Sequence, residues 1–229
     1  GHLNWKSDTY EDYNGLSIEN NADTSDHSAF MAFMDAINNG TPTDAEKVLN
    51  VDGMLLYAAF NSIFVNLDSY TGNGHNYYLY EHEGVFTVVP WDLNEAFGNF
   101  TCGCNSDAVI NFLLDEPTCG ALEGRPMLDI LFQEPQWLAQ YHDHLASMIE
   151  GPFTEENMET WIQEAGDLIR PYVYADPTKF YSNQDFEIAL VGGGATPGKI
   201  MPLLPFVVDR RESIEQQLEG RLPRTNNGQ

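Results

Sequence analysis

Two acidic residues, Asp68 and Asp92, flank a segment whose pattern predicts a β-hairpin. Two amides, Asn73 and Asn76, follow the first of them. Carboxylates with amide oxygens nearby can hold a divalent metal ion and orient a hydroxyl nucleophile, as enzymes of phosphoryl transfer do. Paired carboxylates also serve glycoside hydrolysis, and oxygen-rich loops also bind calcium. The residue types alone therefore leave three kinds of chemistry open.

The spacing of these residues favours phosphoryl transfer without proving it. Asp68 could accept a proton from a substrate hydroxyl. Asn73 lies five residues further on, the offset of the metal-binding amide in the catalytic loop of protein kinases, and Asn76 lies eight further on. Asp92 follows a hairpin, as the metal-binding Asp of kinases does. Acidic turns flank hairpins in many proteins, so spacing alone is weak evidence.

The elements around Asp68 and Asp92 explain how they would be presented. Residues 51–65 are apolar on nearly all sides, which predicts a central buried helix that delivers the chain to Asp68. Residues 76–81 and 85–89 are rich in aromatic and β-branched side chains and predict two strands around the turn at 82–84. Pro90 would end the second strand. Asp92 is then expected in a loop just beyond it.

The rest of the chain predicts more helices, and so a mainly α (α+β) protein with one small hairpin. A helix ending at Gly40 would be capped by Ser25 or Ser28, and Thr43 with Glu46 forms a candidate capping box. Helices are also predicted from 125, from 134, from 154 to just before Pro171, from 185 to 191 and over 205–218. A short strand is expected at 16–18.

The charge and the cysteines limit the setting. There are 35 acidic and 10 basic residues, a net charge of −25, which disfavours nucleic acid and anionic membranes as partners. No apolar run reaches the roughly 18 residues that a membrane span needs. The simplest use of the three cysteines is one disulfide between Cys119 and either Cys102 or Cys104, which implies an oxidising compartment. We expect an extracellular or cell-surface location.

Two longer motifs carry a family resemblance. The segments NGHNYYLY (73–80) and VPWDLNEAFG (89–98) resemble the signature of the spore coat protein H (CotH) kinase family. The likeness extends to the segments 10–13, 125–127, 169–173 and 210–214, so it covers nearly the whole chain.

The resemblance implies an atypical protein kinase that moves phosphate from ATP to Ser or Thr of a secreted or surface protein. Asp68 would be the catalytic base. Asp92 would bind the Mg²⁺ or Mn²⁺ that bridges the ATP phosphates, with Asn76 as a second ligand and Asn73 as its rival. Ca²⁺ is an alternative ion. His75 is expected in a structural or substrate-contacting role, because the sequence identifies no partner to orient its ring, and Trp91 and Phe97 are expected to pack around the Asp92 loop.

One feature departs from a complete kinase. Kinases use a strand-borne Lys in an N-terminal lobe to hold the phosphates, but Lys6 is the only lysine before Asp68 and lies in a polar turn. We therefore expect residues 1–25 to be a polar entry segment from a missing N-terminal lobe, 26–220 a kinase-like C-terminal lobe, and 221–229 a linker or tail. The alternatives are a non-catalytic surface, adhesion or spore-coat-type structural module and, more weakly, a carbohydrate-active enzyme. The sequence does not predict an oligomeric state.

Overall fold

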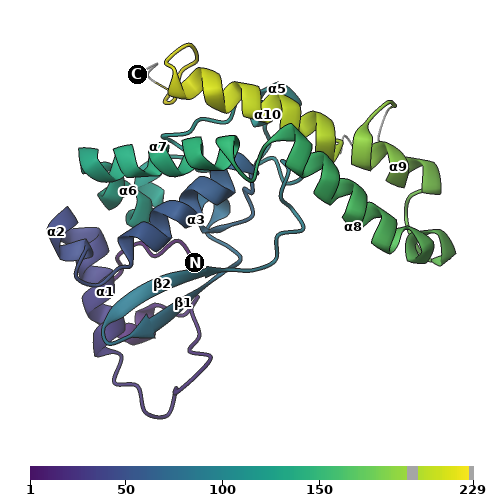
Figure 1. Ribbon diagram of the computed structural model, residues 1–229. Helices are drawn as coiled ribbons and strands as arrows, with labels where there is room; N and C mark the ends of the chain where they lie inside the picture. Colours follow the sequence, from purple (N-terminus) through teal and green to yellow (C-terminus); the bar gives the residue numbers. More distant parts are fainter. Residues whose placement is uncertain (195–200, 227–229) are drawn as a thin grey trace.

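The computed structural model describes residues 1–194 and 201–226 as a helical body that carries one β-hairpin and extends into a two-helix arm (Figure 1). This confirms the predicted mainly α class with a small antiparallel sheet. The strands are β1 (Tyr77–His82) and β2 (Val85–Pro90). The helices are α1 (Ser28–Asn39), α2 (Pro42–Ala45), α3 (Val51–Ile63), α4 (Tyr70–Asn73), α5 (Ser106–Ile110), α6 (Pro126–Phe132), α7 (Pro135–Glu150), α8 (Glu155–Ala175), α9 (Asn183–Val191) and α10 (Leu203–Leu218), with 3₁₀ turns at Tyr10–Asp12 and Leu122–Gly124.

Helix α3 is the centre of the core, as its apolar sequence predicts. Met54, Leu55, Ala58, Ala59 and Ile63 have no exposed surface. The helix contacts α6, α7, α10 and β2, so it is covered on several sides at once. Burial of this kind stabilises the fold through the hydrophobic effect, at roughly 25 cal/mol for each Å² of apolar surface removed from water. The core therefore fixes the element that leads into Asp68.

A buried arginine fixes the end of α3. Arg210 of α10 donates to the carbonyl oxygen of Ser62 at 2.9 Å and to that of Ile110 at 2.7 Å. The last carbonyls of a helix carry partial negative charge and lack partners within the helix, so a cation is well placed there. Full burial lowers the pKa of Arg210 to about 10. The hydroxyl of Tyr141 also donates to Ser62 Oγ at 2.8 Å, so the chain leaves α3 from a fixed point.

The hairpin forms as predicted and is joined directly to the start of α3. Its register runs from Tyr77 opposite Pro90 to His82 opposite Val85. The two turn residues are Glu83 and Gly84, both with positive φ, as tight hairpin turns require. The amide of Phe86 donates to Val48 O, and the amide of Asn50 donates to Phe86 O, each at 2.8 Å. The strand that leads to Asp92 is thus anchored to the helix that leads to Asp68.

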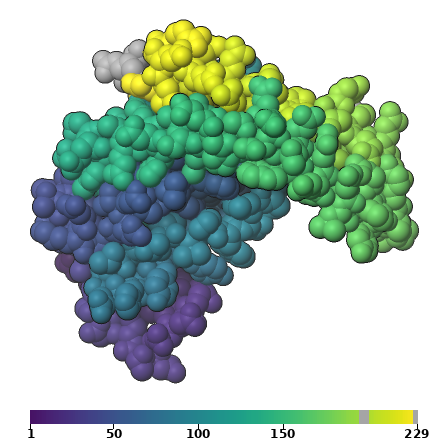
Figure 2. Space-filling model, in the orientation of Figure 1, coloured from purple at the N-terminus to yellow at the C-terminus, as the bar shows by residue number. Residues whose placement is uncertain are grey.

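Helices α8 and α9 form an arm that extends beyond the body (Figures 1 and 2, green). The prediction that α8 ends before Pro171 is wrong, because the helix continues to Ala175. Proline removes one helical hydrogen bond, but contacts on both sides of it keep the helix in place. Arg170 Nε donates to Glu187 of α9 at 2.7 Å, and the hydroxyl of Tyr174 donates to the same carboxylate at 2.8 Å.

Two helix starts differ from the sequence prediction. Thr41, not Thr43, caps α2, and Thr41 and Asp44 form the capping box in place of Thr43 and Glu46. Pro42 explains the shift, because proline favours the first helical position. The cap then falls on the residue before Pro42, which is Thr41. Neither predicted serine caps α1, whose preceding residue is His27. Asp26 Oδ1 accepts from the amide of Ser28 at 3.0 Å instead.

The predicted strand at 16–18 is also wrong. The amide of Leu16 donates back to the carbonyl of Tyr13 at 3.0 Å, which closes a turn. Within the described residues, the sheet holds β1 and β2 and no segment pairs with 16–18. Nearby, Leu3 and Tyr13 are buried against the helical body. The segment therefore attaches through single apolar side chains and turns.

The disulfide joins Cys102 to Cys119. This confirms the predicted bridge and selects Cys102 over Cys104, which is a free, half-buried thiol. In the described part of the chain, no helix is long and apolar enough to cross a membrane.

Candidate functional site

Asp68 lies where a buried turn reaches the surface. The residues before it, Val65, Asn66 and Leu67, are at most 2% exposed, whereas the Asp68 side chain is 24% exposed. The amide of Asn66 donates to the carbonyl of Asn61 at 2.9 Å, so the turn is bound to the last turn of α3. The backbone of Asp68 is therefore held by the core while its carboxylate remains reachable from solvent.

A single helical turn, α4, follows Asp68 where the sequence predicts a loop. Ser69 caps it by accepting from the amide of Gly72, and Gly74 ends it in the left-handed conformation with φ of 71°. Gly72 is needed for close packing, because a Cβ at this position would overlap the backbone of Leu67. The turn therefore folds back tightly and returns the chain to Asp68.

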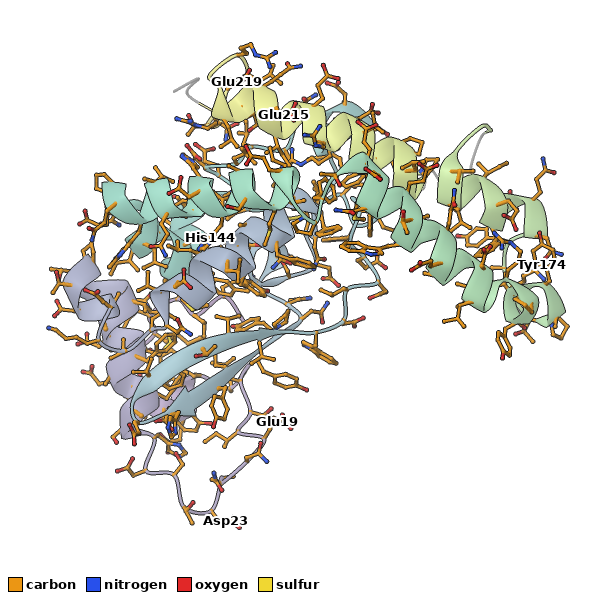
Figure 3. All side chains as sticks on the ribbon, viewed as in Figure 1. Glu19, Asp23, His144, Tyr174, Glu215 and Glu219 are labelled. Carbon is orange, nitrogen blue, oxygen red and sulfur yellow. A yellow bond between two sulfur atoms is a disulfide. The ribbon has the colours of Figure 1, made fainter. Side chains whose placement is uncertain are left out.

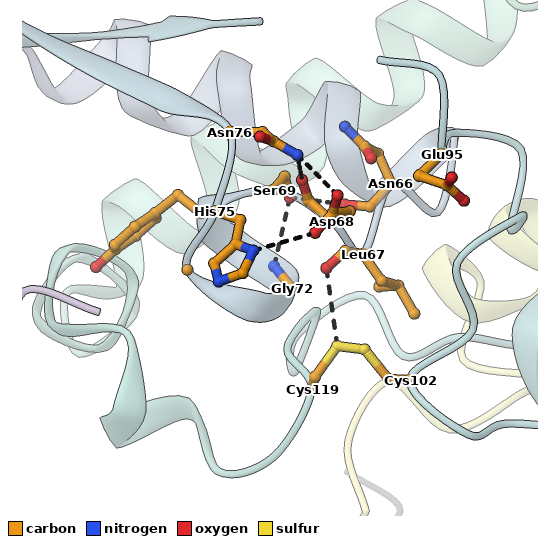
Figure 4. Close-up of polar contacts among 12 residues, drawn as sticks. Asn66, Leu67, Asp68, Ser69, Gly72, His75, Asn76, Glu95, Cys102 and Cys119 are labelled. Carbon is orange, nitrogen blue, oxygen red and sulfur yellow. Dashed lines mark hydrogen bonds and ion pairs between the residues drawn. A yellow bond between two sulfur atoms is a disulfide. The ribbon is translucent and has the colours of Figure 1, made fainter. Parts of the chain in front are cut away.

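Asn76 binds Asp68 directly. Its Nδ2 donates to the backbone carbonyl of Asp68 at 2.9 Å and to carboxylate Oδ2 at 2.7 Å (Figure 4). A side-chain amide has two hydrogens to donate and one oxygen that accepts, so both donors are used and Oδ1 is left for another partner. Asn76 has φ of 50°, a conformation that Asn adopts more readily than most residues. The unusual backbone conformation and the two hydrogen bonds together indicate that the position of Asn76 beside Asp68 is tightly constrained.

His75 approaches the other oxygen of the same carboxylate. Its Nδ1 lies 3.5 Å from Asp68 Oδ1, and its ring is 59% exposed (Figure 4). The sequence identifies no partner for the His75 ring, and the structure shows that Asp68 faces it. Asn76 and His75 therefore divide the two carboxylate oxygens between them.

Asp92 makes no hydrogen bond or ion pair with this group in the described structure. It is exposed two residues beyond β2, with φ of 55°, and no hydrogen bond or ion pair in the described residues joins it to Asp68 or Asn76. Asn73 ends α4 half-buried and likewise makes no side-chain contact with Asp68 in the described part of the chain. The structure thus brings Asp68, Asn76 and His75 into direct contact, and in the described residues neither Asn73 nor Asp92 is bonded to them.

The loop after Asp92 returns to the end of α3. The amide of Phe97 donates to the carbonyl of Phe64 at 2.7 Å, and its ring packs against Phe64 and Phe206. Phe97 is therefore a packing residue, as expected. Trp91 also packs, by stacking on Tyr78 with 5.3 Å between ring centroids, although it is 47% exposed.

Two residues near Asp68 were missed by the sequence analysis. Asn66 is 1% exposed and donates to Asn61 Oδ1 at 2.9 Å, while its own Oδ1 has no partner among the described residues. Arg125 is 3% exposed and donates to the carbonyl of Gly72, which also accepts from the amide of Cys119 at 2.9 Å. Burial lowers the pKa of Arg125. The family resemblance includes residues 125–127, but the sequence does not predict that Arg125 binds the carbonyl of Gly72.

The carboxylate and amide oxygens around Asp68 and Asn76 fit a metal ion that takes its remaining ligands from water and phosphate. Within the described residues, no group of three or more His, Cys, Asp or Glu side chains could hold an ion by itself. Free amide oxygens do occur at Asn76 and at the buried Asn66. Mg²⁺ commonly takes one or two carboxylates and completes its shell with water and substrate phosphates. The residues therefore fit a shared metal site and not an all-protein cage.

The fold is a helical α+β lobe that carries the Asp68–Asn76 pair, and sequence comparison assigns its family. The family model described as CotH kinase protein matches residues 2–214, so the chain belongs to that family. It is similar to the inner spore coat protein H of Bacillus subtilis (strain 168), with 29% identity over 147 residues. That match covers 63% of this chain and 37% of the relative, so the chain spans well under two thirds of the relative's length.

Proposed function

We propose that this chain is the phosphotransferase lobe of an atypical protein kinase, which moves the γ-phosphate of ATP to a Ser or Thr hydroxyl of a protein. The observation that carries the proposal is the double hydrogen bond from Asn76 to Asp68. These hydrogen bonds fix the solvent-reachable carboxylate of Asp68, and they turn the amide oxygen of Asn76 away from that carboxylate. Membership of the CotH kinase family supports the same assignment.

Asp68 is the base in this proposal. Its carboxylate is held at Oδ2 by Asn76 at 2.7 Å and is partly exposed, so an incoming hydroxyl can reach it. A base works best when it is already oriented, because no freedom is then lost in reaching the transition state. The rigid turn behind Asp68 supplies that orientation.

Asn76 and Asp92 would hold Mg²⁺ or Mn²⁺, and a bound ion would neutralise the charge of the ATP phosphates. Asn76 Oδ1 is free for this role because both amide hydrogens are engaged by Asp68. Asn73 is the less supported ligand, because it makes no contact with Asp68. A chain of net charge −25 needs such an ion to bind a polyphosphate. Asp92 is exposed and has a left-handed backbone conformation. In this proposal its carboxylate binds the ion when the Asp92 loop turns toward Asn76.

The acceptor and the location follow from the relative and the disulfide. The similar Bacillus protein is named as an inner spore coat protein. The disulfide between Cys102 and Cys119 fits an oxidising surrounding. We infer a secreted or surface-associated protein substrate.

The proposal is tested by phosphate transfer from γ-labelled ATP with Mn²⁺, with autophosphorylation and a Ser/Thr-rich acceptor protein both measured. The assay uses this chain and the intact protein that contains it. Asp68→Asn should reduce transfer by roughly 100-fold or more, while Asp23→Asn, on an exposed loop away from the site, should not. Transfer that is equal in wild type and Asp68→Asn contradicts the assignment.

A non-catalytic coat or surface module is the second candidate. The name of the Bacillus relative favours it. The two candidates differ in nucleotide binding. A kinase lobe should gain thermal stability from ATP with Mn²⁺, because a ligand that binds only the folded state stabilises it. A structural module should show no such gain.

A further inference from the structure

Helix α8 carries one apolar stripe that is fully explained by packing. Met158, Ile162 and Gly166 are buried where α8 contacts α9 and α10. Gly166 allows a close approach, because a Cβ there would come within 2.7 Å of Leu190 Cδ1. This inner stripe attaches the arm to the body.

A second apolar stripe on the same helix has no partner in the described structure. It consists of Trp161, Ala165, Leu168, Tyr172 and Ala175, all of them exposed, and we call it the outer stripe. Trp161 is 50% exposed, Leu168 73% and Tyr172 76%. The arm extends away from the body (Figure 2), and the exposed fractions show that the described residues leave the outer stripe uncovered.

The spacing of the outer stripe is that of a helix-pairing seam. Successive members are separated by four, three, four and three residues, which is the alternation of the a and d positions in a coiled coil. At about 1.5 Å per residue, the stripe is about 21 Å long. Single exposed apolar residues are ordinary, but a contiguous row marks an interaction site. The geometry therefore suits another helix lying along α8.

The charges beside the outer stripe are acidic. Helix α8 carries five acidic residues, Glu155, Glu156, Glu159, Glu164 and Asp167. Its one basic residue is Arg170, which is already paired with Glu187 and Asp167. Exposed acidic side chains also gather elsewhere, as Glu19 and Asp23 show on the long N-terminal loop (Figure 3). A second copy of this chain would bring acidic surface against acidic surface.

We propose that the outer stripe is a docking surface for a basic amphipathic helix of a partner protein. The apolar face of the partner covers Trp161, Leu168 and Tyr172, and its flanking Lys and Arg side chains lie near Glu164. Helix-in-groove recognition uses anchors with this periodicity, and charge complementarity selects the partner and its orientation. A single helical stripe offers a small contact surface, and small interfaces are typical of transient complexes, so we expect binding of roughly micromolar strength. The surface belongs to the arm and does not depend on catalysis at Asp68.

The test uses a synthetic helical peptide of about three heptads with Leu at a and d and Lys at e and g. Its matched control has Glu at e and g. Isothermal titration calorimetry with the whole chain should show micromolar binding of the Lys peptide, weakening as salt is raised. The Glu peptide should bind at least roughly tenfold more weakly, because like charges face each other.

Variants of the chain locate the binding surface. Leu168→Ser combined with Tyr172→Ser should weaken the Lys peptide roughly tenfold or more, and both side chains are exposed, so circular dichroism should stay unchanged. Tyr80→Ser, 61% exposed on the hairpin, should bind like wild type. Equal binding by the double variant overturns the proposal, as does equal binding of the Glu peptide. A wild-type dimer in ultracentrifugation that the double variant abolishes also overturns it, because the occupant is then a second copy.

Discussion

The side chain of Asn76 donates both of its amide hydrogens to Asp68, one to the backbone carbonyl and one to the carboxylate. This contact orients the carboxylate and the backbone of the same residue together. Because both amide hydrogens are used, the oxygen is the part of the Asn76 side-chain amide that remains available to bind a metal ion. One residue thus positions the proposed base and presents a metal-binding oxygen beside it.

Removing this amide should abolish transfer without unfolding the protein. Asn76→Gly keeps the left-handed backbone, with φ of 50°, because glycine adopts it readily. We expect transfer to fall by roughly 100-fold and the free energy of unfolding by about 1–3 kcal/mol. Asn73→Ala is the control and should have a much smaller effect on transfer. A larger loss for Asn73→Ala than for Asn76→Gly would make Asn73 the ligand.

The close approach at Gly72 predicts a localised packing defect. Gly72→Ala places a methyl group against the backbone of Leu67, and we expect it to cost about 1–3 kcal/mol of stability. Gly124→Ala is the matched control, because no atom lies within 4 Å of a Cβ built there and its φ is not positive. Urea denaturation of both variants measures the difference. Equal stabilities would mean that the turn after Asp68 is loosely packed.

The disulfide joins the loop beyond Asp92 to the segment behind Asp68. Cys102 and Cys119 are separated by 17 residues, and closing a loop of that size typically stabilises a protein by about 3 kcal/mol. The variant Cys102→Ser with Cys119→Ser should lose about this much in urea denaturation. Cys104→Ser should stay close to wild type, and non-reducing peptide mapping should find the Cys102–Cys119 link. Mapping that instead finds Cys104 paired with Cys119 contradicts the structure.

Buried tyrosines predict a loss of stability at alkaline pH. Burial raises the pKa of Tyr57 to about 12 and also raises the pKa of Tyr70. The unfolded chain loses these protons near pH 10, whereas the folded chain keeps them. The contribution of Tyr57 is therefore fully present below pH 10 and is lost as the pH rises through about 12, and that of Tyr70 is lost in the same direction. The melting temperature should fall above pH 10, and it should fall less steeply in the Tyr57→Phe variant. This variant should also be less stable than wild type at pH 8, because the amide of Tyr70 loses the hydroxyl of Tyr57 as its acceptor. A slope unchanged by Tyr57→Phe would exclude this residue as a cause.

Much of the fold follows from local patterns in the sequence. Continuous apolar residues in α3 and alternating residues in the hairpin predict both elements, because burial decides their structure. Helix α8 shows where this fails. Pro171 predicts a helix end, but contacts of Arg170 and Tyr174 with Glu187, which is distant in sequence, hold the helix together. Long-range contacts of this kind are invisible to periodicity.

The candidate site residues were chosen by residue identity and not by geometry. The motifs select Asp68 and Asn76, and the structure pairs them. The sequence could not show that His75 faces Asp68, because this depends on the one-turn helix α4 and on the left-handed backbone at Asn76. It also could not choose between Cys102 and Cys104, which lie two residues apart, because the pairing depends on how distant loops pack.

The most direct test of the proposed site is a crystal structure with Mn²⁺ and a non-hydrolysable ATP analogue, with the ion located by its anomalous scattering. The proposal predicts Mn²⁺ bound to Asn76 Oδ1 and to the carboxylate of Asp92, with the Asp92 loop turned toward Asp68. The γ-phosphate should lie within reach of a hydroxyl held by Asp68. An ion or nucleotide bound away from Asn76, with Asp92 still apart under saturating conditions, would contradict the proposed site.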